Sequence, residues 1–226
     1  MTSTQIRPTR RTLVRGAAWS VPVVSIAAAA PAFAASACNQ TLNWASLGNG
    51  AVFSSTTVAG ITITLSLSGA TTAANNRTVS TTQTGGQTSN LRFYSTGTAN
   101  SSQTATFTFT KGGQPFNVTN LSFSFLDIDS GGASWDDRVW VGTAGFTRAI
   151  QNTTYVTGTG VDLANAFRGN GTNTSGQVQG GQTNGNVQVT WAAALNSVSF
   201  TYAQDGTANG SPFIGISNMS FTAAVC

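Results

Sequence analysis

Carboxylates are the scarce reactive groups of this sequence, and four of its six acidic residues lie between positions 127 and 137. The four are Asp127, Asp129, Asp136 and Asp137. Carboxylates beside a glycine turn with free carbonyls are the hard oxygen ligands that calcium prefers. The alternative is that these aspartates accept hydrogen bonds in turns, and that Arg138 pairs with Asp136 or Asp129.

Two expected strands must position this cluster. Residues 121–125 alternate apolar and serine side chains, which is typical of a strand with one buried face, and Asp127 and Asp129 continue the buried, odd-numbered face. A glycine pair at 131–132 turns the chain, and a second strand begins at Asp137. If the two strands pair, the three carboxylates meet at one end of the sheet. We therefore expect Asp127, Asp129 and Asp137 to bind Ca²⁺.

The same segment resembles a known type of protein module. Asp127, Asp129, Trp135, Asp137 and Val139 match extracellular bacterial β-sandwich modules in which an Asp-x-Asp strand end precedes a Trp-x-Asp-x-Val strand start. The resemblance is confined to this short segment. It implies structural calcium and attachment to surface or adhesive proteins.

Aromatic side chains offer a second kind of site, because an exposed ring beside polar groups can stack on a sugar. Trp135 is the candidate ligand-facing aromatic, since a loop tryptophan with small neighbours has little core to enter. We expect packing rather than ligand contact for the strand aromatics, which are Tyr94, Trp140, Trp191 and Tyr202.

The N-terminus carries the features of an export signal. Arg10 and Arg11 form a twin-arginine pair, a weakly apolar stretch follows from 16 to 31, and small residues at 32–34 suit a signal peptidase. The apolar stretch is too short for a confident membrane span. We expect residues 1–34 to be a helical signal peptide that is cleaved after Ala34, with cleavage after Ala37 as the alternative.

Residues 10–24 of this leader resemble the twin-arginine signals of secreted proteins from high-GC Gram-positive bacteria. The resemblance implies that the protein folds before export and is extracellular or attached to the cell surface. It carries no information on the function of the mature chain.

Loss of the leader changes the charge of the protein. Four of the ten basic residues leave with it, so the mature chain has six basic and six acidic residues, and no nucleic-acid partner is expected. The sequence contains no histidine and no glutamate, which excludes a Ser-His-Asp triad and a histidine zinc site in this chain. We therefore expect a protein that is not an enzyme.

Two cysteines, Cys38 and Cys226, stand near the two ends of the mature chain. An even number of cysteines in an exported protein predicts a disulfide, which requires the first and last strands to be neighbours. Lipid modification of Cys38 is the alternative.

Short alternating segments separated by turn residues predict an all-β fold for residues 35–226. We expect one antiparallel β-sandwich domain, jelly-roll or Ig-like, with a closed barrel as the alternative. One short helix is expected near 162–168, capped by Asp162, with Leu163, Ala166 and Phe167 on a common face.

Three functions fit these features. The first is a secreted or cell-surface module, stabilised by calcium and active in adhesion or envelope architecture. The second is a carbohydrate-binding module, and the third is a glycoside hydrolase or lyase that uses two of the four clustered aspartates. We expect the first, with a cell-envelope polysaccharide or a surface protein as the partner and no membrane span in the mature chain.

Overall fold

The computed structural model describes residues 37–98, 100–132, 134–170, 178, 180–206 and 211–224. The chain divides into two units, Met1–Ala34 and Ala35–Cys226, and every described residue belongs to the second. The predicted signal peptide, with Arg10 and Arg11, lies outside the described residues.

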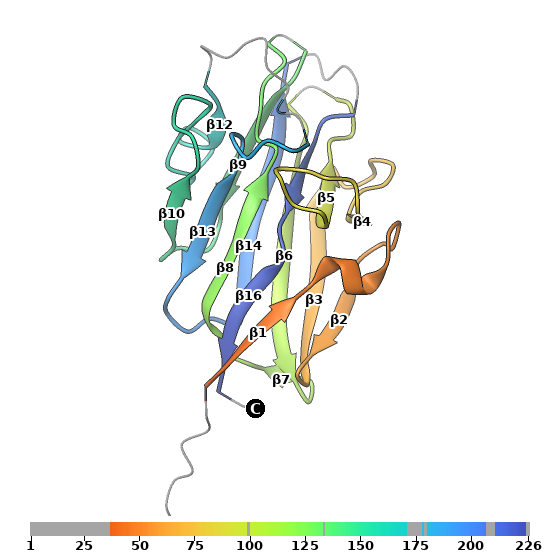
Figure 1. Ribbon diagram of the computed structural model, residues 1–226, viewed down its shortest axis with the longest axis vertical. Coiled ribbons are helices and arrows are strands. Elements are labelled where there is room, and N and C mark those ends of the chain that lie inside the picture. Colours follow the sequence, from red (N-terminus) through yellow and green to blue (C-terminus); the bar gives the residue numbers. More distant parts are fainter. Residues whose placement is uncertain are drawn as a thin grey trace, which may run out of the picture. The chain divides into compact units, whose positions relative to one another are not determined.

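The second unit is an antiparallel β-sandwich, as the sequence predicts, and Figure 1 shows its strands running along the long axis. The first sheet has eight strands. Along its main path these are β1 (Cys38–Leu42), β16 (Met219–Ala223), β8 (Thr119–Leu126), β15 (Phe213–Ile216), β5 (Asn90–Tyr94) and β4 (Thr78–Ser80), and on the other side of β8 lie β13 (Val187–Trp191) and β10 (Thr147–Ile150).

The second sheet also has eight strands. Its path is β11 (Val156–Thr157), β12 (Phe167–Gly169), β9 (Asp136–Val141), β14 (Ser197–Asp205), β6 (Ser102–Lys111), β3 (Ile61–Gly69) and β2 (Ser55–Val58), with β7 (Gln114–Pro115) paired to β6. One 3-10 helix, η1 (Trp44–Leu47), follows β1. Strand β1 ends at Leu42, because the Asn43 side chain accepts a hydrogen bond from the Ala45 N–H and starts this helix.

Phenylalanine rings from both sheets form the centre of the core. The ring of Phe200 on β14 meets Phe93 on β5 and Phe125 on β8 edge to face, at centroid distances of 5.2 and 5.1 Å. Phe107 and Phe109 on β6 are fully buried, and the threonines that alternate with them face outward. Each sheet thus has one buried face and one solvent-facing face, as the alternation of apolar and polar residues predicts.

The predicted helix near 162–168 is wrong. The Asp162 carboxylate accepts hydrogen bonds from the Asn165 backbone and side chain, at 2.8 and 2.9 Å, and closes a single turn. Phe167 then enters β12 and pairs with Val139 of β9, while Leu163 is 52% exposed. Strand pairing with β9 prevails over helix propensity here, so the expected common apolar face does not form.

The two strands expected on either side of the 131–132 glycine pair do not pair with each other. Strand β8 belongs to the first sheet and β9 to the second, so residues 127–135 carry the chain from one sheet to the other. Strand β8 pairs with β13 on one side and with β15 and β16 on the other. No edge of β8 is left for β9.

Strand β1 pairs with β16, with Cys38 opposite Ala223. This confirms that the first and last strands are neighbours, which the predicted disulfide requires. Cys226 lies outside the described residues, and the Cys38–Cys226 bond stays a prediction.

We expect that neither Cys38 nor Cys226 of the exported protein reacts with a thiol-labelling reagent until a reductant is added. Reduction should lower the stability by about 4–5 kcal/mol, because the bond closes almost the whole chain. Denaturant titration with and without reductant measures this difference. Labelling of both cysteines in the native, unreduced protein would contradict the disulfide.

Candidate functional site

The candidate site lies where the chain leaves β8 and crosses to β9. Asp127 has a left-handed backbone conformation, with φ of 68°. This turn breaks the period of two, because the even-numbered Ile128 packs in the core, whereas Leu126 is buried outside the core cluster, against Gly85. The expectation that Asp127 continues the odd-numbered face of β8 is therefore wrong. The crossing is anchored by the Ile128 N–H, which donates to the Gly185 carbonyl at 3.0 Å.

Asp129 is buried and accepts hydrogen bonds through both carboxylate oxygens. The indole Nε1–H of Trp135 donates to Oδ1 at 2.8 Å, and the backbone N–H of Val178 donates to Oδ2 at 2.7 Å. The Trp135 ring also lies against Gly131, where a Cβ atom would come within 2.5 Å of it. The predicted ligand-facing aromatic is thus half-buried, with its polar atom committed to Asp129.

Asp137 is 1% exposed and lies on the inner face of β9. Its Oδ1 accepts a 2.7 Å hydrogen bond from the Tyr202 hydroxyl on β14, and its Oδ2 accepts a longer one, 3.4 Å, from the Asp129 N–H. The Asp137 N–H donates in return to the Asp129 carbonyl at 3.0 Å. Asp129 and Asp137 therefore come together without strand pairing between β8 and β9.

Burial and mutual repulsion disfavour the charged forms of these carboxyl groups. Burial is the main cause that raises the pKa of Asp127 to about 7; the charge of Asp129 adds to this, and Arg92 opposes it. Burial also raises the pKa of Asp137 well above its usual range, with a further contribution from Asp129 and opposition from the Tyr202 hydrogen bond. The pKa of Asp129 is raised by burial and lowered by its two donors.

The described residues contain four buried side-chain polar atoms with no hydrogen-bond partner, and all four are oxygens. Two are carboxylate oxygens, Oδ1 of Asp127 and Oδ1 of Asp136, and two are amide oxygens, those of Asn186 and Gln204. Gln204 lies opposite Asp137 in the β9–β14 register. Unpaired acceptor oxygens of this kind can take up a proton, a water molecule or a cation.

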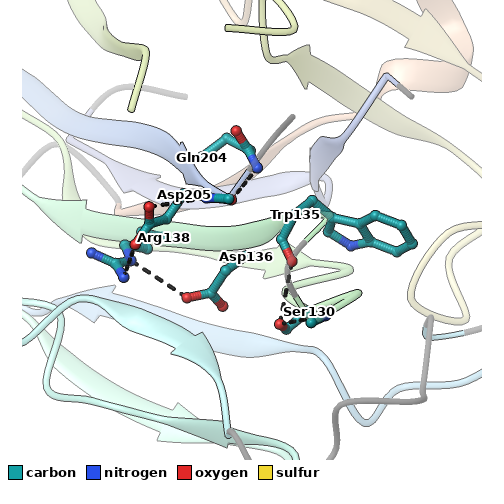
Figure 2. A network of polar contacts seen from close by, with 8 residues as sticks. Ser130, Trp135, Asp136, Arg138, Gln204 and Asp205 are labelled. Atoms are coloured by element: carbon teal, nitrogen blue, oxygen red, sulfur yellow. Dashed lines mark hydrogen bonds and ion pairs between the residues drawn. The ribbon is translucent and has the colours of Figure 1, made fainter. Parts of the chain in front are cut away.

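Asp136 faces outward from β9, one residue before the inward-facing Asp137. Its carboxylate lies 3.5 Å from Nε of Arg138, whose Nη2 also forms an ion pair with Asp205. Figure 2 shows these three side chains turned toward one another and the Trp135 ring directed away from them. Arg138 therefore pairs with Asp136, which is one of the two pairings that the turn-and-ion-pair alternative allowed.

A cleft of about 490 Å³ opens beside this outer network. Ser130, Asp136, Arg168 and Asp205 are among its lining residues. Neither Asp129 nor Asp137 reaches it, so the inner carboxylates and the cleft are separate features.

The predicted calcium ligands have the right oxygen chemistry, but their geometry does not form a coordination group. Calcium takes six to eight oxygen ligands. Among the described residues, no three metal-ligating side chains gather around one point. Both oxygens of Asp129 and of Asp137 already accept hydrogen bonds, so Asp127 is the predicted ligand with an uncommitted buried oxygen.

Sequence reasoning missed the donors that hold the cluster. Tyr202 was expected to pack, but its hydroxyl is the shortest contact of Asp137. The sequence does contain a pattern that could have indicated this role of Tyr202. Val198, Phe200, Tyr202 and Gln204 alternate along one buried face of β14, so the hydroxyl and the amide lie at one end of that face. The Val178 N–H comes from a distant loop, and no local pattern indicates it.

No family model, curated protein or solved structure matches this chain. Within the described residues, no helix has the length and apolar character needed to cross a membrane.

The raised carboxyl pKa values predict that the folded protein loses stability as the pH rises. The pKa of Asp127 in the folded protein, about 7, lies above the ordinary value of 3.8, so folding takes up a proton at pH values between the two. Its contribution is fully present below about pH 4 and is lost as the pH rises through about 7. Without added divalent ions, the melting temperature should fall across this window, and Asp127→Asn should reduce the fall.

Asp162→Asn is the matched control, because Asp162 is an exposed turn residue, and it should keep the wild-type pH dependence. Thermal unfolding followed by circular dichroism measures all three proteins. Parallel curves for wild type and Asp127→Asn would contradict the role of Asp127.

Proposed function

We propose that the protein is an exported, non-catalytic β-sandwich module of the cell surface that acts in adhesion or envelope architecture. The twin-arginine leader and the balanced charge of the mature chain support this assignment. The observation that carries it is the state of the two inner carboxylates. Every oxygen of Asp129 and Asp137 accepts a hydrogen bond from the protein itself, and both side chains are buried.

This arrangement suits support of the fold better than catalysis. A general acid or base must reach the proton that it transfers, directly or through one water. Asp129 and Asp137 are enclosed, and in the cleft Asp136 and Asp205 share the guanidinium of Arg138. The hydrolase or lyase alternative therefore has no uncommitted pair of carboxylates among the described residues.

Surface location is tested on intact cells with an antibody and with added protease. The wild-type protein should be accessible to both. Replacing Arg10 and Arg11 with lysine should abolish access, because the export route reads the arginine pair. The control Arg7→Lys should remain accessible. Equal access for wild type and the twin-lysine variant would contradict the export route, and no access for either would contradict the surface assignment.

The proposal includes calcium as the stabilising ion of the inner cluster. Two observations support calcium binding, because both indicate too few positive charges and donors around these carboxylates. Oδ1 of Asp127 has no hydrogen-bond partner, and the pKa values of Asp127 and Asp137 are raised. A carboxylate oxygen has two lone pairs, so the bonds from Tyr202 and Trp135 can persist beside an ion. Binding requires the three side chains to approach more closely than they do here.

Calcium should raise the melting temperature relative to chelator at pH 8, which lies above the pKa of about 7 for Asp127. A hundredfold excess over the dissociation constant stabilises the folded form by about 2.7 kcal/mol. Asp127→Ala should abolish the response, whereas Asp205→Ala, which alters the outer network, should keep it. Identical melting of the metal-free wild type with and without calcium would contradict calcium binding. Protonation would then be what neutralises the buried carboxyl groups.

A further inference from the structure

Trp140 differs from the other three described tryptophans because it neither packs in the core nor donates a hydrogen bond to a buried carboxylate. Trp44 and Trp191 are buried in the core, and Trp135 donates to Asp129. Trp140 is half-buried on the outer face of β9, where Val139 and Val141 take the inner positions. In the described part of the chain, its ring contacts no other aromatic ring and its indole N–H has no hydrogen-bond acceptor.

Rows of hydroxyl side chains lie beside Trp140 on the same outer face. Trp140 stands opposite Thr201 of β14, which bonds to Thr104 of β6 at 2.8 Å. Beyond this pair lies a set that we term the hydroxyl face, and its members are Thr64, Ser66, Thr106, Thr108 and Ser197. Neighbouring hydroxyls lie about 4.8 Å apart across strands and about 6.7 Å apart along them.

The members of the hydroxyl face form no side-chain hydrogen bonds within the described residues. The outer face of the first sheet differs in this respect. There Ser122 bonds to Thr190 at 2.9 Å and accepts from Gln188 at 3.2 Å, and Thr222 bonds to Asn39 at 3.0 Å. These hydroxyls of the first sheet are thus paired within the protein, whereas the members of the hydroxyl face keep donors and acceptors open to a partner.

The hydroxyl face is also uncharged. The outward side chains of β3 and β6 are serine and threonine, and Lys111 stands at the far end of β6. At the opposite end, Arg138 forms ion pairs with Asp136 and Asp205, and the exposed Arg168 of β12 stands opposite Arg138, outside the hydroxyl face. A charged partner gains nothing from such a face, but a neutral partner rich in hydroxyl groups matches it.

We propose that Trp140 and the hydroxyl face bind a neutral polysaccharide. The indole ring offers an apolar surface to one face of a sugar ring, and its N–H, with the neighbouring hydroxyls, exchanges hydrogen bonds with sugar hydroxyls. Each contact is weak because water competes for it. A polymer repeats the same groups along the rows, so many weak contacts add. This inference rests on the proposed surface function and names the partner of that module.

Retention of the purified protein on insoluble cellulose, chitin and starch tests the inference, with an acidic polysaccharide gel, pectate, as the charged comparison. At least one neutral polymer should retain the protein in moderate salt, and pectate should not. Trp140→Ala should weaken retention by about tenfold, the loss of one good aromatic contact. Since Trp140 lies outside the core, the variant should keep the fold of the wild type, which circular dichroism checks.

Thr64→Lys places a charge on the hydroxyl face and should also weaken retention. Its matched control is Ser220→Lys, at an exposed strand position on the outer face of the first sheet, which should bind like the wild type. No retention on any neutral polymer, or equal retention of all variants, would overturn the inference and leave the surface module standing. Release of reducing ends in the same tubes would instead overturn the non-catalytic function.

Discussion

The structure depends on removing two carboxylates from water at the point where the chain passes between the sheets. Asp129 and Asp137 lie against each other there, and the fold compensates them with an indole N–H, a phenolic O–H and two backbone N–H groups. These donors come from three separate segments. The cluster therefore ties the crossing, β14 and the loop at Val178 into one unit, and losing one donor would leave a buried charge unpaired.

The parts of this arrangement that follow from local pattern were predictable. Alternation predicts the buried faces of β3, β6, β8 and β14, and the acidic cluster identifies the crossing as unusual. The pairing of strands was not predictable in the same way, because period two does not tell which edge a strand joins. Residues 121–141 read as a hairpin for this reason, although β8 has its neighbours elsewhere in the sequence.

Two further features of the site have no local signal. The left-handed backbone at Asp127 is a property of the crossing, and aspartate is one of the few residues that tolerate it. The helix expected near 162–168 gives way to β12 because β9 offers a free edge there, and an edge partner outweighs a weak propensity. In both places tertiary contacts decide the backbone.

The pairing of β1 with β16 has a consequence for the order of folding. The strand nearest the start of the domain finds its partner in the strand nearest the end, and the Trp44 indole N–H donates to the carbonyl of Ser217 at 2.8 Å. Contacts of such long sequence separation form slowly, because a large loop must close first. The first sheet thus cannot close until the ribosome has released β16, so β1 must wait for its partner while all the residues between them are synthesised.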